Sequence, residues 1–420
     1  MSTMGTMAQS VLKDSIIELN EFLIKADRLN EFSYGSKVQN AESSLIKQYK
    51  TQNLSDLIRS ESSVYIKSYG PGNLATSSIR GASANQTAII FNGFNINSPM
   101  NGISDLSLIP VCFFDDMQIQ YGGSGTLWGS GAIGGSIHLN NQPVFNKGLK
   151  ISAGSSIGSF NSLRHDLDLL LSGQKWISVI RAFRMTAEND FPFYNTALSD
   201  TPLQDQTNSE IEQHGLLFEN YFKPKEDQSL ELILWYQKNK RNIPPNMLQL
   251  EENSHQDDES LRLTTEWKRS FSKSDIFIRS AFFNEDILYE DKTNKILSLS
   301  TSSTLICETE TKIRTGKDQL LNLGLNNTYI SAKADAYNGS PDQNRISLFT
   351  LYRISLLDKK LESVIGARQE IIIGSTPIPL TWSAGLNYIP FKWLSFNLNA
   401  GKVYRLPTFN DLFWIPGSKP

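Results

Sequence analysis

The sequence predicts a mixed α/β domain followed by an antiparallel transmembrane β-barrel that is incomplete in this chain, with about 13 strands. Glycine is concentrated between two short apolar segments near residue 130. From residue 149 to 404, apolar and polar residues alternate in segment after segment, and the connections between these segments are short and long by turns. The glycines indicate close backbone packing in a compact domain, and the later pattern indicates a barrel.

The bulk composition excludes several classes of protein. A chain of 420 residues with a formal net charge of −3 is long enough for a large barrel, and its charge gives no sign of a nucleic-acid-binding surface. No stretch approaches the roughly 18 apolar residues of a membrane-spanning helix, whereas a barrel strand needs only about ten alternating residues. Cys112 and Cys307 lie in apolar contexts, and we expect two unpaired, buried thiols.

Residues 1–40 are predicted to be an N-terminal tether, because they are polar and irregular apart from the apolar-rich segment Ile16 to Ala26. The first residues, Met1 to Gln9, lack the basic and apolar regions of a complete signal peptide. We interpret them as the tail end of such a peptide, with cleavage after Ala8.

Residues 41–143 carry the signals of one compact mixed unit. Asn53 is placed to cap a short helix that runs to Arg59. We expect four short strands in this unit, at residues 64–67, 87–91, 118–121 and 136–139. Two polar loops, residues 68–73 and 92–102, follow the first two strands.

The glycine-rich stretch between the last two strands does not fit a catalytic or nucleotide-binding loop. Gly129 to Gly134 spells G-x-G-x-x-G, but a strand follows it, and no acidic residue occurs in the next stretch of about 20 residues. Neither Ser124 nor Ser130 has glycines two positions before and after it, as a nucleophile elbow requires, and no Gly-Lys-Ser/Thr run is present. We expect these glycines to allow close packing of backbone against backbone.

The connections in residues 148–420 favour a membrane barrel over a soluble all-β fold, which is the alternative. Short connections are expected at 158–162, 172–175, 223–228, 270–274, 315–319 and 357–360, and long ones at 187–212, 240–259, 290–302 and 332–342. Tight turns at one end of the hairpins and long loops at the other are typical of outer-membrane barrels.

The chain resembles the TonB-dependent outer-membrane receptors, with a plug domain at residues 41–143 inside a barrel at 148–420. The matching motifs are Leu54-Ser-Asp-Leu-Ile58, Ser78-Ile-Arg-Gly81, Ile89-Ile-Phe-Asn-Gly93, Ile109-Pro110, the stretch Gln118 to Ile137 and, near the end, Tyr404 to Trp414. Asn92 stands where the family usually has aspartate. The resemblance implies a structural role in the plug for Arg80, Gly81, Asn92, Gly93, Gly122, Gly123, Gly125, Gly129, Gly131, Gly134 and Gly135. For Arg80 we expect an ion pair with a barrel carboxylate.

The resemblance also implies two binding regions. The segment Glu21, Phe22, Leu23, Ile24, Lys25 and Ala26 is the candidate TonB box, which would add a strand to a TonB-like periplasmic energy-coupling protein. A plain N-terminal strand or a disordered tether is the alternative. The apical loops of the plug would contact the ligand through Ser68, Tyr69, Gly70, Asn73, Phe94, Asn95, Asn97, Ser98 and Asn101, which are otherwise ordinary turn residues.

The implied function is active transport of a scarce, large ligand across the outer membrane, with cobalamin as the expected ligand and no enzymatic activity. Siderophore or haem uptake, a non-transporting surface receptor and a non-functional truncated remnant are the alternatives. The resemblance also allows calcium in the outer loops, where acidic residues are otherwise simply solvated; the metal ligands are left unassigned. The candidate carboxylates are Glu188, Asp190, Asp200, Asp205, Glu251, Glu252, Asp257, Asp258 and Glu259.

Two further expectations concern His138 and the number of strands. His138 lies at ligand spacing from no other histidine, so we expect a hydrogen-bonded structural residue. About 13 strands are too few for the roughly 22-stranded barrel of such transporters. We therefore expect a fragment of a longer protein, a misread start and stop, or a broken gene, and the sequence fits all three.

Overall fold

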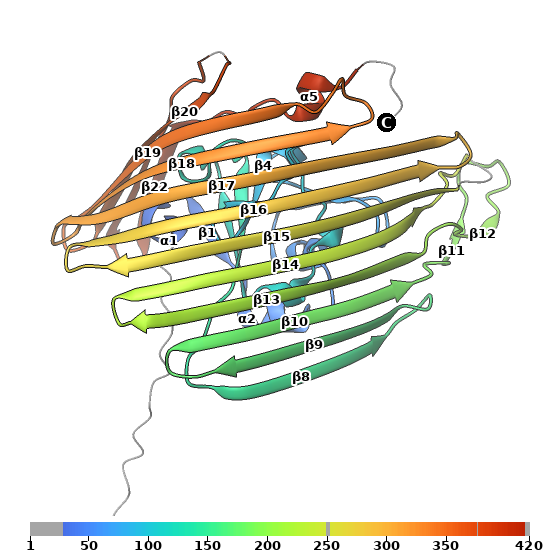
Figure 1. Ribbon diagram of the computed structural model, residues 1–420, viewed down its shortest axis with the longest axis horizontal. Coiled ribbons are helices and arrows are strands. Elements are labelled where there is room, and N and C mark those ends of the chain that lie inside the picture. Colours follow the sequence, from blue (N-terminus) through green and yellow to red (C-terminus); the bar gives the residue numbers. More distant parts are fainter. Residues whose placement is uncertain (1–27, 249–252, 376, 416–420) are drawn as a thin grey trace, which may run out of the picture.

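The computed structural model describes residues 28–248, 253–375 and 377–415. A broad curved sheet wraps around a smaller domain (Figure 1). We call the smaller domain, residues 28–140, the plug and the curved sheet the barrel wall. None of the helices in the described part of the chain is long and apolar enough to cross a membrane.

The plug consists of short helices and strands. Its helices are α1 (Arg28–Phe32), α2 (Ser43–Gln48), α3 (Leu54–Glu61) and α4 (Gly125–Trp128), with 3-10 turns η1 (Ala84–Gln86), η2 (Leu106–Leu108) and η3 (Val111–Phe113). Its strands are β1 (Lys37–Asn40), β2 (Tyr65–Ser68), β3 (Ala75–Ser78), β4 (Thr87–Phe91), β5 (Phe94–Asn95), β6 (Asp116–Tyr121) and β7 (Gly135–Asn140). The four strands expected in this region are all present.

Helix α3 begins where the sequence predicts. The Asn53 side chain accepts hydrogen bonds from the backbone N–H groups of Ser55, at 3.0 Å, and Asp56, at 3.3 Å, and so satisfies two donors of the first turn. Leu57 and Ile58 are fully buried on the inner face of the helix. The cap and the apolar face together fix the helix against the plug core.

The central sheet of the plug begins before residue 41, the expected start of the domain. In the described chain the sheet has five strands in the order β1-β6-β7-β4-β5, and β1 pairs antiparallel with β6. Residues 28–40 were expected to be part of the tether, but α1 and β1 belong to the plug. Strand β1 supplies hydrogen-bond partners for one edge of β6, which would otherwise be unpaired.

The glycine-rich stretch packs as expected, against both the plug and the barrel region. A Cβ atom at Gly134 would lie 2.6 Å from the Cβ atom of Ala82 and 2.8 Å from the carbonyl oxygen of Ile79. A Cβ atom at Gly125 would lie 3.2 Å from a methyl group of Val403. Only glycine fits such close approaches without displacing a neighbour.

The barrel wall is antiparallel throughout, with the sheet order β22-β21-β20-β19-β18-β17-β16-β15-β14-β13-β10-β9-β8, 13 strands within the described residues. The strands are β8 (Gly148–Ile157), β9 (Leu163–Ser172), β10 (Trp176–Ala187), β13 (Ile211–Lys225), β14 (Gln228–Ile243), β15 (Ser254–Ser270), β16 (Ser274–Asp291), β17 (Ile296–Gly316), β18 (Gln319–Ala334), β19 (Asp342–Leu356), β20 (Leu361–Ile372), β21 (Thr381–Phe391) and β22 (Leu394–Lys402). The expected number of strands is confirmed.

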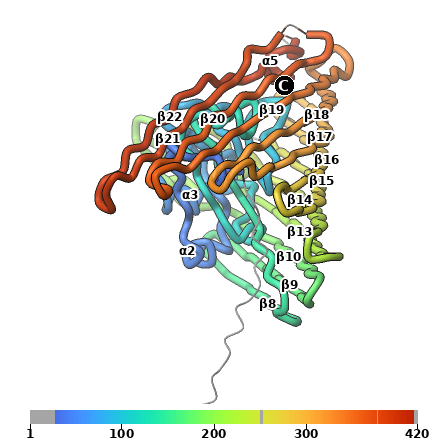
Figure 2. Tube along the Cα trace, turned by 90° about the vertical axis from the view of Figure 1, so that its left-hand side faces the viewer, coloured from blue at the N-terminus to red at the C-terminus, as the bar shows by residue number. Residues whose placement is uncertain are grey.

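The two edge strands of the wall, β8 and β22, are not paired with each other in the described chain. The wall is therefore open on one side, where part of the plug is visible (Figure 2). A small ribbon of β11 (Pro192–Tyr194) and β12 (Leu203–Asp205) lies in the connection between β10 and β13.

The wall strands are apolar on the outside and polar on the inside. Along β18, Leu323 and Leu325 are exposed, whereas Asn322 is fully buried on the plug side. Along β20, Ile365 and Ile371 are exposed, whereas Arg368 is buried. An outward apolar face with a polar interior is the pattern of a membrane barrel.

The alternation of turns and loops is confirmed, although two loops are shorter than expected. The turns at one end cover residues 226–227, 317–318 and 392–393, and connections at the other end include residues 188–210 and 335–341. Strand β15 begins at Ser254, so Asp257, Asp258 and Glu259 are strand residues and not loop residues. Strands β16 and β17 likewise leave only residues 292–295 of the loop expected at 290–302.

The cysteine prediction is half right. Both thiols are free, and Cys112 is buried in the plug. Cys307 is exposed on the outer face of β17, in line with Leu305, because the alternation of the strand places both on the membrane side.

The last described segment folds back toward the plug. Helix α5 (Phe409–Phe413) starts at the N-cap Thr408. The N–H groups of Phe409 and Asn410 donate to the carbonyl oxygens of Pro99, at 3.1 Å, and Met100, at 2.9 Å. The segment therefore contacts the second apical loop directly.

Candidate functional site

A large cavity lies at the end of the molecule that carries the long loops. We call it the outer cavity; it measures about 1380 Å³ including its open mouth. The plug contributes Tyr69, Asn73, Ser98 and Asn101, all of them predicted ligand contacts. Its wall residues include Ile243, at the loop end of β14. These predicted contacts come from two separate apical loops and meet at one cavity.

The outer cavity presents charged side chains of both signs. Arg241 donates to Asp105 of the plug, with Nη1 and Oδ2 2.6 Å apart. Arg262 pairs with Glu285 at 2.9 Å. The cavity therefore offers amide, phenol and paired charged groups, which suit a large polar ligand.

A second cavity of about 1310 Å³, the inner cavity, lies between the plug and strands β16 to β20. Phe94, Asn95 and Asn97 line it together with Ser98. Both cavities share Ile96, Ser98 and Glu285 in their linings, so they adjoin.

Two of the predicted ligand contacts have structural roles. The Asn97 side chain accepts from the N–H of Ile89 at 2.9 Å and donates to the carbonyl oxygens of Thr87 and Gly102. Phe94 is buried, and its ring meets the ring of Phe283 edge-on at 6.4 Å. Both residues hold the apical loop in place.

The first apical turn presents Tyr69 to the outer cavity. Ser68 and Gly70 flank it, and the Ser68 hydroxyl accepts a hydrogen bond from the N–H of Gly70 at 3.4 Å. Asn95 accepts from the N–H of Asn97 at 3.0 Å. These bonds shape the turns, and Tyr69 and Asn73 remain directed at the cavity.

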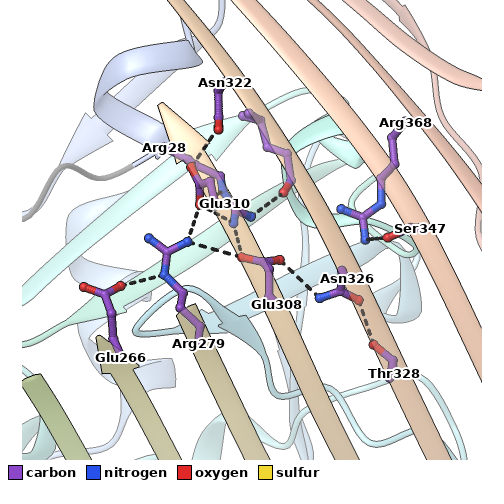
Figure 3. Close-up of polar contacts among 11 residues, drawn as sticks. Arg28, Glu266, Arg279, Glu308, Glu310, Asn322, Asn326, Thr328, Ser347 and Arg368 are labelled. Atoms are coloured by element: carbon purple, nitrogen blue, oxygen red, sulfur yellow. Dashed lines mark hydrogen bonds and ion pairs between the residues drawn. The ribbon is translucent and has the colours of Figure 1, made fainter. Parts of the chain in front are cut away.

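A buried ionic cluster joins the start of the plug to the wall (Figure 3). Arg28 of α1 pairs with Glu308 and, at 2.7 Å, with Glu310 of β17. Arg279 of β16 pairs with the same two carboxylates. Asn322 also donates to Glu310, at 2.8 Å. We call these five residues the latch cluster.

In the latch cluster two guanidinium groups face two carboxylates, and Arg279 also pairs with Glu266 at 2.6 Å. Burial disfavours the charged form of Arg28, but Glu308 and Glu310 outweigh this effect and raise the pKa of Arg28 above its ordinary value. The guanidinium of Arg28 also lies 4.7 Å from the centre of the Phe349 ring. Arg28 is therefore charged and held on several sides.

Other ion pairs connect the plug to further strands of the barrel wall. Lys50 pairs with Asp168 of β9. Asp115 pairs with Arg181 of β10 at 2.7 Å. Together with the bond between Asp105 and Arg241, these contacts connect the plug to three further wall strands, β9, β10 and β14.

The predicted ion pair of Arg80 is wrong. Arg80 is exposed, adopts a φ of 53°, and places its guanidinium 5.8 Å from the centre of the Tyr121 ring. No described carboxylate forms an ion pair with it. The neighbouring residues fulfil their turn roles, since Gly81 and Gly93 have φ of 77° and 89° and Asn92 has φ of 45°.

His138 is a structural residue, as predicted. Its Nε2 atom lies 2.8 Å from the Ser136 hydroxyl, and its ring stacks obliquely on Trp128 with centroids 4.7 Å apart. Burial lowers the pKa of His138 to about 3, so the ring is neutral at physiological pH.

The acidic residues that the structure describes do not form a metal site. Among residues 28–248, 253–375 and 377–415, no three His, Cys, Asp or Glu side chains are arranged to hold an ion. Glu251 and Glu252, like the candidate TonB box Glu21 to Ala26, lie outside the described residues.

Two protein families match the chain over nearly its whole length. Residues 31–136 match the TonB-dependent Receptor Plug Domain, and residues 115–419 match the TonB dependent receptor-like beta-barrel. This chain belongs to the TonB-dependent receptors. TonB-dependent receptors of this type reside in the outer membrane, which agrees with the apolar outer face of the wall.

The curated relatives of this TonB-dependent receptor include vitamin B12 transporters. The chain is 24% identical to the vitamin B12 transporter BtuB of Vibrio vulnificus over 385 residues, which cover 89% of this chain and 60% of that protein. It is 32% identical over 95 residues to the vitamin B12 transporter BtuB of Vibrio cholerae, which covers 22% of this chain and 16% of that protein. The receptor chain thus spans about 60% of the first of these relatives.

Solved TonB-dependent receptors share the fold. The FrpB iron transporter of Neisseria meningitidis superimposes with a TM-score of 0.74 at 12% identity, over 90% of this chain and 65% of that one. The ferric enterobactin receptor PfeA of Pseudomonas aeruginosa gives a TM-score of 0.70 at 14% identity, over 89% of this chain and 62% of that one. At such identities the likeness establishes the fold only.

Proposed function

We propose that this receptor imports cobalamin across the outer membrane, with the plug as the gate and a TonB-like periplasmic protein as the source of energy. The observation that carries the proposal is the outer cavity, which plug and wall enclose together at the long-loop end. The choice of ligand is supported by the 24% identity to a vitamin B12 transporter over 89% of the chain.

The outer cavity suits a large ligand rich in amides. Its mouth is open, and its volume with the mouth included is about 1380 Å³. Asn73 and Asn101 contribute amides, and Tyr69 contributes an aromatic face with a hydroxyl group. Cobalamin carries many amide side chains, which can exchange hydrogen bonds with such groups.

Coupling to the partner would act through the N-terminal segment. We propose that Glu21 to Ala26 adds a strand to a sheet of the TonB-like protein, a mode that needs only free backbone and alternating side chains. Arg28 follows this segment within two residues. A force applied to this segment by the partner would therefore act on the latch cluster before any other described contact of the plug.

Uptake of a ferric siderophore or haem is the second candidate. It is favoured by Arg241 and Arg262 in the outer cavity, since guanidinium groups recognise anionic oxygen ligands. A surface receptor that binds without uptake and a non-functional remnant are the remaining alternatives. In none of these functions does the protein change a covalent bond of its ligand.

Growth of a deletion strain complemented with the full-length gene tests the proposal. We expect the gene to restore growth on limiting cobalamin but not on limiting iron. The double variant Tyr69→Ala/Asn73→Ala should raise the cobalamin concentration needed for growth at least tenfold, because it removes two cavity contacts. Asn161→Ala is the matched control, since Asn161 lies in the turn 158–162 and bonds to Glu188 outside the cavity.

Three other outcomes of these experiments would each favour one of the alternative functions. Rescue under limiting iron alone would favour a siderophore or haem receptor. Binding of cobalamin without growth would favour a non-transporting receptor. Neither binding nor growth would favour a remnant.

A further inference from the structure

Two arginines of the inner cavity share a single distant carboxylate. Arg345 of β19 and Arg368 of β20 both line this cavity, and so does Glu370. The nearest nitrogen of each guanidinium lies 3.7 Å from a Glu370 oxygen. This distance exceeds the 2.7–3.2 Å typical of N–H···O hydrogen bonds. Two positive charges therefore face one negative charge without a close bond to it.

Both guanidinium groups also have unused donors. The Nε atoms of Arg345 and Arg368 are buried, and neither has a hydrogen-bond partner within the described protein. Arg368 makes one close bond, from Nη2 to the Ser347 hydroxyl at 2.7 Å (Figure 3). Glu370 also interacts electrostatically with the Tyr404 side chain. Buried donors on a charged group are costly to leave unpaired.

The other carboxylates of the inner cavity are committed to other arginines. Glu285 pairs with Arg262 at 2.9 Å. Glu308 pairs with Arg28 in the latch cluster. Neither carboxylate forms an ion pair with Arg345 or Arg368 in the described chain. The excess of positive charge is therefore local to these two arginines.

The glycine-rich loop lies against the Arg368 guanidinium. A Cβ atom at Gly129, where φ is +80°, would lie 3.4 Å from Nη2 of Arg368. Gly131 also has a positive φ, and the Ser130 hydroxyl accepts the N–H of Leu406 at 2.8 Å. At Gly129 the loop thus faces Arg368 with backbone and no side chain.

We propose that Arg345 and Arg368 form an anion-binding subsite that receives a phosphate group of the ligand during its passage. Arginine presents paired N–H donors that match two oxygens of a phosphate. The subsite lies beyond the outer cavity and on the way to the latch cluster, since the inner cavity touches both. The assignment deepens the proposed function, because cobalamin carries a phosphodiester; inorganic phosphate shares the same chemistry.

The thermal stability of the full chain in detergent tests the subsite without reference to the transported ligand. We expect sodium phosphate to raise Tm relative to sodium chloride of equal ionic strength. Arg345→Gln and Arg368→Gln should each weaken the apparent phosphate affinity at least tenfold. Arg184→Gln should not, because Arg184 is exposed and pairs with Glu212 outside the cavity. Arg368→Lys keeps the charge without the paired donors, and we expect an intermediate loss if the fold is intact.

A comparison of cobalamin with cobinamide, which lacks the phosphate together with the ribose and the benzimidazole base, tests the link to transport. The unaltered protein should bind cobalamin at least tenfold more tightly, and Arg368→Gln should reduce this preference while binding of cobinamide stays the same.

No phosphate stabilisation, or equal stabilisation in the glutamine variants, would overturn the subsite. Phosphate stabilisation that depends on both arginines, in a protein that binds neither corrinoid, would support the subsite and refute cobalamin as the ligand. Cobalamin binding with the same preference in Arg368→Gln would support the proposed function and refute the subsite.

Discussion

Removal of one charge from the latch cluster should loosen the N-terminal end of the plug. Glu310 is fully buried and accepts hydrogen bonds from Arg28 at 2.7 Å and Asn322 at 2.8 Å, in addition to its pair with Arg279. Glu310→Gln keeps the size of the side chain but removes one of the two carboxylates that pair with Arg28, whereas Arg279 keeps its pair with Glu266 at 2.6 Å. Breaking a buried ion pair in this way costs about 3 to 5 kcal/mol.

The size of this penalty fixes the expected readout. Since about 1.4 kcal/mol corresponds to a factor of ten, the opening of α1 should become more frequent by about two to three and a half orders of magnitude. Hydrogen exchange of the backbone amides in residues 28–40 measures this opening. Amides of β9 and β10, which lie far along the wall from the cluster, should keep their protection.

A surface pair provides the control. Glu212 and Arg184 are both exposed and form an ion pair at 2.9 Å, so Glu212→Gln should change exchange by less than tenfold. Arg28→Met combined with Glu310→Gln should exchange more slowly than Glu310→Gln alone, because it removes the buried cation that has lost one of its two carboxylate partners. Unchanged exchange at α1 in Glu310→Gln would refute the view that this cluster holds the plug.

Three further predictions concern the plug. Gly134→Ala should lower the free energy of unfolding of the plug in denaturant by about 1 to 3 kcal/mol, because the new Cβ atom would lie 2.6 Å from that of Ala82. Unchanged stability would contradict the close packing at Gly134. Burial lowers the pKa of His138 to about 3, whereas the unfolded chain binds this proton near pH 6.5. The free energy of unfolding should therefore fall as the pH is lowered from 6.5 to 3. A His138→Asn variant should lose this dependence of stability on pH. Burial raises the pKa of the Cys112 thiol to about 11. In a Cys307→Ser variant, which lacks the exposed thiol, maleimide at pH 8 should label Cys112 only after unfolding, and rapid labelling of the folded variant would disprove the burial of Cys112.

Local patterns were sufficient to predict most of the fold. Asn53 caps α3 because the bonds that it makes are to residues two and three positions away. The alternation of apolar and polar residues predicts the wall strands because the period of two is a property of the strand itself. The crowding at Gly134 follows from the glycine-rich sequence in the same way.

Long-range pairing was beyond the reach of such patterns. Arg28 meets Glu310, 282 positions away, and nothing near Arg28 in the sequence marks it as a plug anchor. Arg80 belongs to a recognisable motif but lies exposed beside Tyr121. The acidic run Asp257 to Glu259 resembles a solvated loop, yet it forms part of β15 because cross-strand partners such as Lys238, 3.0 Å from Glu259, stabilise it there.

The ligand contacts were predicted in part for the same reason. Polar residues in apical loops do indicate a binding surface, and Tyr69, Asn73, Ser98 and Asn101 do line the outer cavity. The sequence does not show which side-chain amides are already hydrogen-bonded within the plug. The Asn97 amide is one of these, and its partners are backbone atoms of other strands and turns. Nor does the sequence show that Arg345 and Arg368 share one carboxylate.

Uptake of radiolabelled cobalamin by cells that express the full-length gene tests the central proposal most directly. We predict accumulation that requires both the gene and the TonB-like protein, and that falls at least tenfold when Leu23→Pro disrupts strand addition in the candidate TonB box. Absence of uptake, or uptake that is equal without the TonB-like protein, would contradict the proposal that this receptor is an energised cobalamin transporter.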